Sequence, residues 1–550
     1  MTRHATIEAR AWGIGAVAVS LIVAVPVAVI VTVSASDPGR AWDHVVETRL
    51  SAYATNTALL TVLAASLAVP LGVLPAWLLT AYRFPMCKAL EWALLLPLAV
   101  PPYISAYAYT DVLQFSGPLQ SWVRGVFGVD SVPWFPEPRS IVGASLVLAC
   151  ALFPYVFVAA RQSFAAHATY TTRVARTLGC GPTRAFASVA LPMTLPAILG
   201  GVALVVMETI ADFGVAEYCA VDTFATGVYR SWLGLDAPGA AARLSLILLT
   251  IVTALLGLIH LVRSRLRSEH NAGTPHEVTP LRGLRSVLAI AVCATPITLG
   301  FMIPVATLIG IAWGNDSNDP TRDLVTHAAN TATLATIAAL CAVGLAVVSV
   351  YGRRVRPTRT VRLGARVAWL GYAIPGTVVA VGLLIPLTHA DRVLAQLATV
   401  MRTDDTRAGL LLSGSVFAIV LGCQTRFLAV AISSVEAAFG RVGRSLDDAA
   451  RTLGRGPTES LLRLHVPACR AGLVVAALLV FADVSKELPM TLLLRPFNFD
   501  TLAVRAHQFA AEERLAEASV PALGLVALGL IPVGILATTV TPRGRTAHDA

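Results

Sequence analysis

Long apolar runs separated by short polar segments make up most of the chain. Twelve of these runs approach or exceed the roughly 20 residues that an α-helix needs to cross a bilayer. They lie at residues 11–33, 50–82, 92–110, 140–160, 194–216, 244–262, 286–314, 328–351, 367–390, 408–425, 471–490 and 518–541. Only the fifth and eleventh runs contain acidic or basic side chains. The pattern therefore predicts an all-α, polytopic membrane protein with about 12 transmembrane helices.

The second half of the chain repeats the pattern of the first. ARTLGCGPT starts at residue 175 and ARTLGRGPT at 450, an offset of 275; NTALLTVLAASLAV starts at 56 and NTATLATIAALCAV at 330, an offset of 274. We therefore expect two tandem six-helix domains, at 1–270 and 285–550, joined by a linker at 271–284. Each domain crosses the membrane an even number of times, so both have the same orientation. This arrangement predicts pseudo-two-fold symmetry along the membrane normal.

Composition and charge support a membrane location. The chain is 56% hydrophobic and 13% charged, with a mean hydropathy of +0.71, whereas soluble domains carry about 25% charged residues. Of the 42 basic residues, 28 lie in segments that the twelve-span pattern places on one side. The positive-inside rule makes that side, with both termini, cytoplasmic. The net charge of +10 therefore reflects topology and not a nucleic-acid partner. The eight scattered cysteines form no CxxC pair, which excludes zinc and redox motifs with that spacing.

The duplicated polar stretch lies in the longest predicted cytoplasmic loop of each half, between the fourth and fifth spans. Gly179 and Gly454 stand where a helix can end in the left-handed conformation, and Pro182 and Pro457 can open the next helix. We expect a helix–turn–helix at the cytoplasmic surface in each half. Two such loops suit docking to a two-fold symmetric partner; the alternative is a well-capped connecting loop.

The spacing from each glycine to a Leu-Pro or Val-Pro pair resembles the EAA loop of permease subunits in binding-protein-dependent ABC importers. In that family the loop forms coupling helices that sit in a cleft of the ATPase subunits. The second copy, Asp448-Ala449-Ala450, nearly matches the family pattern, whereas the first departs from it at Arg173. The resemblance assigns ATPase coupling to Ala175, Leu178, Gly179, Pro182, Pro192, Asp448, Ala450, Leu453, Gly454, Pro457 and Pro467.

Two further stretches indicate which group of ABC-importer permeases the chain resembles. ADFGVAEYCAVDTFATGVYRSW from residue 211 and DVSKELPMTLLLRPFNFDTLA from residue 483 are similar to the ferric-iron permeases, in which both domains are fused. Thiamine importers have a similar length and layout and are the alternative for the cargo. The resemblance implies a bacterial cytoplasmic membrane protein with two copies of a cytoplasmic ABC ATPase subunit and an extracytoplasmic binding protein as partners. It implies no cofactor bound by this chain.

The chain lacks the residues of an ATPase. Its two lysines, Lys88 and Lys486, both fall outside a Gly-Lys-Ser/Thr phosphate-binding loop. The chain is therefore not expected to be an enzyme, and ATP hydrolysis is expected in a separate subunit.

Ionisable residues in or beside two spans are candidates for the substrate pathway, because charge in a bilayer is costly. They are Glu208, Asp212, Glu217, Tyr218, Asp222, Asp483, Lys486 and Glu487. Carboxylate and phenolate oxygens suit a hard cation such as ferric iron, although no tight metal site is expected, because a permease must release its cargo. The alternatives are a structural Asp483–Lys486 ion pair, or carboxylates that are solvated or contact the binding protein. Tyr103, Tyr107 and Tyr109 could line a pathway, but such tyrosines more often form an interfacial aromatic belt, to which we assign them.

Two other functional classes remain open. An ion-coupled secondary transporter can also have two parallel six-helix halves, but it predicts a coupling carboxylate deep in the bilayer and no ATPase partner. A membrane scaffold or enzyme is the third class, and the sequence contains no recognisable catalytic set for it.

Overall fold

The computed structural model describes residues 3–36, 39–168, 175–265, 279–314, 321–400 and 410–540. The first half contains α1 (Arg3–Ser34), α2 (Gly39–Thr48), α3 (Leu50–Ala81), α4 (Cys87–Ala93), α5 (Pro102–Leu113), α6 (Pro118–Phe127), α7 (Ile141–Ser163), α9 (Pro182–Ala185), α10 (Leu191–Ala211), α11 (Gly214–Tyr218), α12 (Phe224–Tyr229) and α13 (Pro238–Arg265). The second half contains α14 (Leu284–Ile297), α15 (Ile303–Trp313), α16 (Thr321–Val355), α17 (Arg359–Leu370), α18 (Gly376–Val400), α19 (Val416–Gly440), α20 (Arg444–Thr452), α21 (Pro457–Ser460), α22 (Val466–Ser485), α23 (Pro489–Leu494), α24 (Leu502–Ala511) and α25 (Leu515–Val540).

Short 3₁₀ and π turns connect several of these helices. The 3₁₀ turns are η1 (Leu96–Ala99) and η6 (Gly371–Ala373), and the π turns are η2 (Phe164–Ala168), η3 (Phe186–Ala190), η4 (Arg230–Gly234), η5 (Thr298–Met302) and η7 (Leu461–His465). Two short strands, β1 (Tyr82–Arg83) and β2 (Thr279–Pro280), pair in parallel. The strand β2 belongs to the predicted linker; positions 271–278 of that linker lie outside the described residues.

The number of apolar helices confirms the predicted fold class. Eleven helices in the described ranges are long and apolar enough to cross a membrane, or twelve if one bent pair forms a single span. The bent pair, Cys87–Ala99 with Pro102–Phe127, turns by 93°. The span predicted at 92–110 is therefore not one continuous helix, although the bent pair can count as the twelfth span. Two successive prolines stand at the break, and neither has an N–H with which to continue the helical ladder.

Each span that follows a duplicated loop begins earlier than predicted, at Pro182 in the first half and at Pro457 in the second. A π turn joins the short helix to the long one. The N–H of Leu191 donates to the carbonyl oxygen of Phe186, five residues earlier. The next residue, Pro192, has no N–H and therefore needs no acceptor in the helix. The second half repeats this arrangement. The prolines that were expected to start the spans therefore lie inside continuous helices, because the π turn accommodates them.

The span predicted at 408–425 is displaced along the chain, because α19 covers Val416–Gly440. The prediction ended the helix before the first charged residue, Arg426, and assigned that residue to the cytoplasmic side. In the structure, Arg426 and Gln424 are both buried within the helix. The Gln424 side chain donates to the carbonyl oxygen of Ala338 at 3.1 Å. This bond satisfies the amide nitrogen of the buried side chain.

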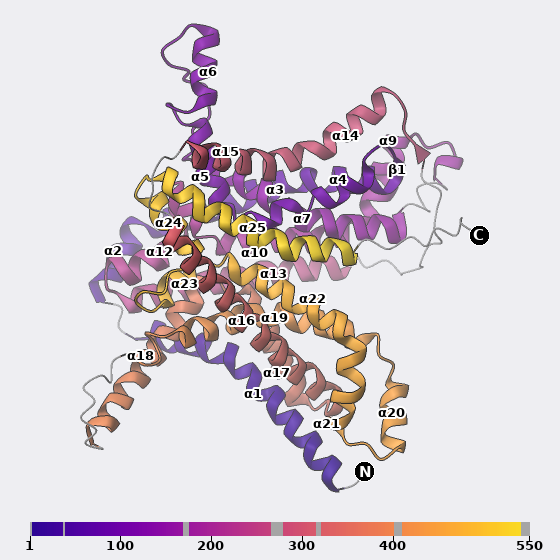
Figure 1. Ribbon diagram of the computed structural model, residues 1–550, viewed down its shortest axis with the longest axis vertical. Coiled ribbons are helices and arrows are strands. Elements are labelled where there is room, and N and C mark those ends of the chain that lie inside the picture. The colour runs from indigo at the N-terminus through magenta and orange to yellow at the C-terminus, as the bar shows by residue number, and fades with distance from the viewer. Residues whose placement is uncertain are drawn as a thin grey trace.

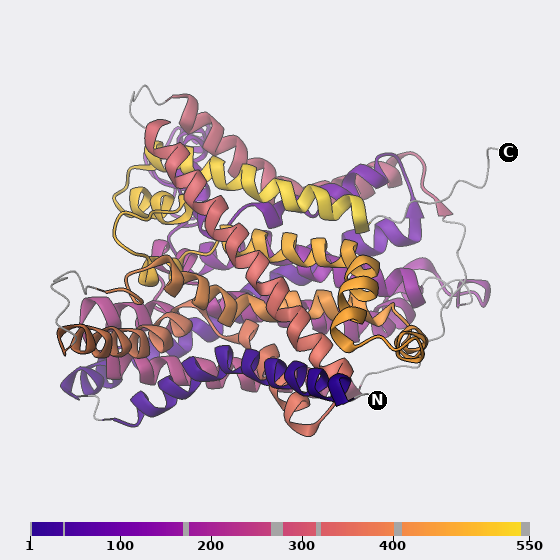
Figure 2. The ribbon, with the colours of Figure 1, turned by 60° about the horizontal axis from the view of Figure 1, so that its bottom comes forward.

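The helices of the two halves interleave. Helix α1 packs against α16, α17 and α18 of the second half, and α14 and α15 pack against α3 and α5 of the first. Figures 1 and 2 show α1 alongside these second-half helices. Two hydrophobic clusters form the core, and each contains residues from both halves. The first helix of each predicted domain thus contributes to the core of the other domain.

Small residues allow close contact between the central helices of the first half. A Cβ at Gly72 of α3 would lie 2.8 Å from the main-chain nitrogen of Phe157, and one at Gly201 of α10 would lie 2.8 Å from Val156 Cα. Glycine at these positions lets the helix backbones approach, as is common within membranes.

The two ends of the helical bundle differ. In Figure 1, α9 and α20 of the duplicated loops lie at the right-hand end, and α12 and α24 lie at the opposite end. Helix α6 projects away from the body.

Candidate functional site

The two duplicated loops have the same backbone conformation. Gly179 has a φ of 91° and Gly454 a φ of 76°, both in the left-handed region. In the first loop, the N–H of Gly179 donates to Arg176 and the N–H of Cys180 to Ala175, each at 3.0 Å. The second loop forms the same two bonds at equivalent positions. This pair of bonds defines a Schellman motif and confirms the predicted helix ends. The predicted starts at Pro182 and Pro457 are confirmed too.

Each loop exposes a leucine directly before its glycine. Leu178 is 80% exposed and Leu453 is 77% exposed. Asp448 is also exposed, and among the described residues it pairs with Arg451 of its own helix, whereas Ala450 is buried. Arg173 of the first loop lies outside the described residues. The loops thus present matched apolar side chains at one end of the molecule.

Ionic contacts anchor the second loop to the body. Asp447 Oδ2 lies 2.8 Å from Arg354 Nε, and Asp447 Oδ1 lies 2.7 Å from His465 Nε2. Arg354 also donates to the carbonyl oxygens of Phe439 and Val442. One carboxylate therefore joins α16 to both ends of the loop.

Helix α1 contributes to the same anchor. Glu8 accepts a hydrogen bond from the N–H of Thr458 at 3.1 Å, and Trp12 Nε1 donates to the Thr458 hydroxyl at 3.2 Å. The first loop has a different support, in which Trp77 packs against Phe164 and Phe186. The two loops therefore share a conformation but not an anchor.

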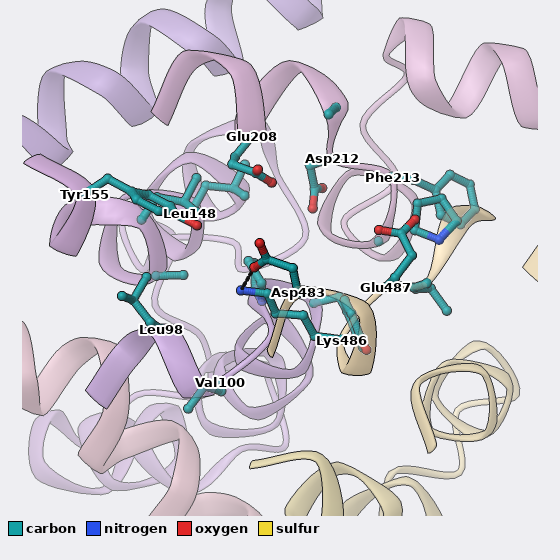
Figure 3. Close-up of a pocket in the computed structure, with 18 of the residues that line it drawn as sticks. Leu98, Val100, Leu148, Tyr155, Glu208, Asp212, Phe213, Asp483, Lys486 and Glu487 are labelled. Atoms are coloured by element: carbon teal, nitrogen blue, oxygen red, sulfur yellow. Dashed lines mark ion pairs between the residues drawn. The ribbon is translucent and has the colours of Figure 1, made fainter. Parts of the chain in front are cut away.

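A charged cavity of about 90 Å³ lies between helices of both halves. Its charged lining consists of Arg426 and of five residues labelled in Figure 3: Glu208, Asp212, Asp483, Lys486 and Glu487. Four carboxylates and two cations give these side chains a formal charge of −2. Five of the eight predicted pathway residues thus meet around one space, and Arg426 joins them.

The carboxylates occupy matching positions in the two halves. Asp212 follows α10 and accepts hydrogen bonds from the N–H groups of the next short helix, α11. Glu487 follows α22, 275 residues later, and accepts from Met490 at the start of α23. Glu208 and Asp483 are separated by the same offset. The two cations have no such counterparts, because alanines occupy positions 151 and 211.

Ion pairs connect the charges around the cavity. Arg426 Nη1 lies 2.8 Å from Glu487 Oε2, and Arg426 Nη2 lies 3.5 Å from Glu208 Oε2. Lys486 Nζ lies 3.2 Å from Asp483 Oδ1, the dashed pair in Figure 3. The Asp483–Lys486 ion pair considered from the sequence is therefore present, and Arg426 links the two halves.

The other three predicted pathway residues do not line the cavity. Asp222 pairs with Arg49 and Arg230, and Glu217 also pairs with Arg230. Tyr218 packs against Tyr107 with a ring separation of 4.5 Å. Helix α11 ends at Tyr218, and the chain then leads away to α12. Arginines near this end of the bundle compensate both carboxylates.

Two cavity residues were missed or misassigned from the sequence. Arg426 was missed because the span was ended one residue before it. Tyr103 was assigned to an interfacial belt, but it is 4% exposed and lines the cavity; Tyr107 and Tyr109 are also buried. Two sequence signals could have identified these residues. Arg426 has apolar residues on both sides, and the double proline that breaks the third span directly precedes Tyr103. Within the described ranges, no group of three or more His, Cys, Asp or Glu side chains could hold a metal ion.

A bundle of apolar helices with a charged internal cavity and a duplicated exposed loop is typical of a membrane transport protein. The chain matches no family model. It is 24% identical over 484 residues to the Fe(3+)-transport system permease protein FbpB 2 of Haemophilus influenzae, covering 87% of this chain and 88% of that protein.

Shorter matches agree with this class. Over 154 residues the chain is 32% identical to the molybdenum transport system permease protein ModB of Escherichia coli, covering 28% of this chain and 64% of that protein. Over 183 residues it is 25% identical to the E. coli sulfate transport system permease protein CysT, covering 32% and 64%. These similarities agree with the predicted resemblance: the chain is similar over most of its length to a ferric-iron transport permease, and over parts of it to molybdenum and sulfate transport permeases.

Proposed function

We propose that this chain is the permease of an ATP-driven importer that moves ferric iron into the cell across the bacterial cytoplasmic membrane. The charge of the cavity carries the proposal. Its lining contains four carboxylates, two from each half, against one arginine and one lysine. Carboxylate oxygens suit hard cations. The relative that is similar over most of this chain is named for Fe(3+) transport.

The charge of the cavity disfavours an anionic cargo. Sulfate, for which CysT is named, is an anion, and a lining of formal charge −2 would repel it. Thiamine is an organic cation and stays the alternative cargo.

ATP is proposed to act through partner subunits at the duplicated loops. Two copies of a cytoplasmic ATPase subunit would each contact one loop, where Leu178 and Leu453 are exposed. An extracytoplasmic binding protein would deliver iron at the opposite end of the bundle. The halves at 1–270 and 285–550 are proposed to move against each other when the ATPase subunits close, each carrying the first helices of the other half that pack on it, α1 with the second half and α14 and α15 with the first. This movement opens the cavity to alternate sides. Both termini then lie in the cytoplasm.

Iron-55 uptake in cells, with ATPase co-purification from the same samples, tests this proposal. The variant Gly179→Asp/Gly454→Asp should lose both uptake and the ATPase, because aspartate strains a left-handed glycine position and adds charge to the proposed contact. The control is Gly234→Asp at the other end of the bundle, where an added Cβ also meets nothing within 4 Å. Co-purification of the ATPase without uptake of iron would contradict the assignment of iron as cargo. Absence of the ATPase from the wild-type sample would contradict the importer mechanism.

A further inference from the structure

Arg426 carries a buried charge. Burying it costs free energy, and the packing of the helices gives no reason for that cost. Its side chain is 7% exposed, and its partners Glu487 and Glu208 are 5% and 22% exposed. Taking an ion pair out of water costs several kcal/mol per ion, and apolar residues often replace such pairs without loss of stability. The first half has Ala151 at the equivalent position. An arginine within a membrane helix, where the other copy has alanine, therefore indicates a role in function.

The polar groups around the cavity are not fully satisfied. Within the described part of the chain, the Arg426 Nε–H and the Tyr103 hydroxyl are buried and have no hydrogen-bond partner. Tyr103 lines the cavity with Glu208, Asp212 and Glu487. Most buried polar groups in proteins are hydrogen-bonded, so these unpaired atoms indicate that the cavity accommodates a further polar species.

We propose that Arg426 is a tethered counter-cation, which holds Glu208 and Glu487 between transport events and is displaced from them by the cargo cation. The inference rests on the proposed function, since it requires a cationic cargo. As placed in the described structure, no three of these carboxylates could hold a metal ion together, so Glu208, Asp212 and Glu487 must turn toward the cation, with the Tyr103 hydroxyl, when the guanidinium withdraws. The guanidinium then recombines with the carboxylates as the cation leaves.

The competition between Arg426 and the cargo explains how an acidic cavity can release a highly charged ion. Without the guanidinium, the formal charge of the lining would fall from −2 to −3, and a trivalent cation would be held more tightly. Arg426 also joins the two halves, because Glu208 lies on α10 and Glu487 follows α22. Cargo that displaces it therefore removes an ion pair between the proposed moving parts.

Binding of Tb³⁺ to the full chain in lipid nanodiscs tests this inference. Tb³⁺ is a hard, redox-inert trivalent cation, and nearby tyrosine sensitises its luminescence. We expect Arg426→Gln to bind Tb³⁺ about tenfold more tightly than wild type, since the variant removes a competing charge. Tyr103→Phe should reduce the sensitised emission of bound Tb³⁺, which assigns the signal to the cavity. The matched control is Arg353→Gln, which removes another arginine–glutamate pair, to Glu436 at 2.6 Å, and should leave Tb³⁺ affinity unchanged.

Arg426→Lys carries the test if Arg426→Gln does not fold. It keeps the charge but offers a single ammonium group in place of the forked guanidinium, so we expect an affinity between those of wild type and Arg426→Gln. Unchanged or weaker Tb³⁺ binding in the folded Arg426 variants would overturn the inference while leaving a cationic cargo in place. Failure of every form to bind Tb³⁺, with sulfate protecting the chain against thermal unfolding, would overturn the proposed function as well.

Discussion

Asn56 and Asn330 form the same hydrogen bond in the two halves of the chain. The side-chain amide of Asn56 donates to the main-chain oxygen of Asp222 at 3.0 Å, and that of Asn330 donates to the main-chain oxygen of Asp500 at 3.1 Å. Both asparagines open the repeated NTA segment. Each therefore ties a long membrane helix to the loop that follows the fifth span of its own half.

Substitution of Asn330 by alanine should destabilise the protein by about 1 kcal/mol, because the partly buried carbonyl oxygen of Asp500 loses the Asn330 amide and keeps His327 Nδ1 as a partner. Asn56→Ala should cost about the same, and the double variant should show additive losses, since the two bonds share no partner. Thermal unfolding in detergent measures the change. Thr253→Ala is the control, because its hydroxyl bonds only to its own helix. A loss in one half alone would contradict the equivalence of the two bonds.

Gly454→Val should impair ATPase binding more than Gly454→Asn. Nothing lies within 4 Å of a Cβ added at Gly454, so the cost comes from its φ of 76° alone. That conformation costs a non-glycine residue about 1–2 kcal/mol; asparagine tolerates it better than a β-branched residue. Co-purification of the ATPase subunit measures the effect. Gly440→Val, at a helical position with equal space, should retain the ATPase; its loss there would indicate general unfolding.

Asp447→Asn should loosen the second loop and leave the first intact. The substitution removes the charge that Arg354 and His465 share, and breaking such a partly buried network costs about 1–3 kcal/mol. Hydrogen–deuterium exchange should rise in residues 441–465 and stay unchanged in 175–190. Equal increases in both segments would contradict the finding that the two loops have separate anchors.

His507 should make the protein less stable in acid. It lies in α24, outside the membrane-spanning helices, and its Nδ1 lies 3.0 Å from the Tyr107 hydroxyl. Burial lowers the pKa of His507 to about 4, whereas the pKa of an unfolded histidine is about 6.5. Between these values the unfolded chain binds more protons, so stability falls as the pH drops. The loss from pH 7 to pH 5 is about 2 kcal/mol.

Thermal unfolding at the two pH values checks this effect. His507→Asn keeps a hydrogen-bonding side chain without a titrating ring, so the difference between pH 7 and pH 5 should shrink. An undiminished difference in this variant would assign the acid sensitivity to other groups.

Apolar run length was enough to predict most of the fold. The prediction from run length failed where a helix continues through a charged residue or a proline, which usually ends a helix. Arg426 lies inside α19 because carboxylates from other helices compensate it, and those contacts are invisible in a local window. Pro192 lies inside a span because a π turn removes the need for its missing N–H. The double proline before Tyr103 had the opposite effect, because it ended a helix inside an apolar run that was predicted as one span.

The candidate site was partly predictable for a similar reason. Glu208, Asp212 and Glu487 stood out as charges in apolar surroundings, and the structure places them around one cavity. Glu217 and Asp222 looked equivalent in sequence, but Arg230 pairs with both, and Arg49, far away along the chain, also pairs with Asp222. Charge in an apolar run identifies candidates, whereas only the packing of helices shows which of them share a space.

The packing of α1 against the second half affects how the protein is made. Helix α1 is synthesised long before α16 and α17, which follow the rest of the first half along the chain. Until then, the face of α1 that will contact them is exposed to lipid or held by temporary neighbours. Closing such a distant contact is slow. A first half produced alone would thus lack the helices against which α1 packs. Because both halves belong to one polypeptide, each α1 is made together with one copy of those helices.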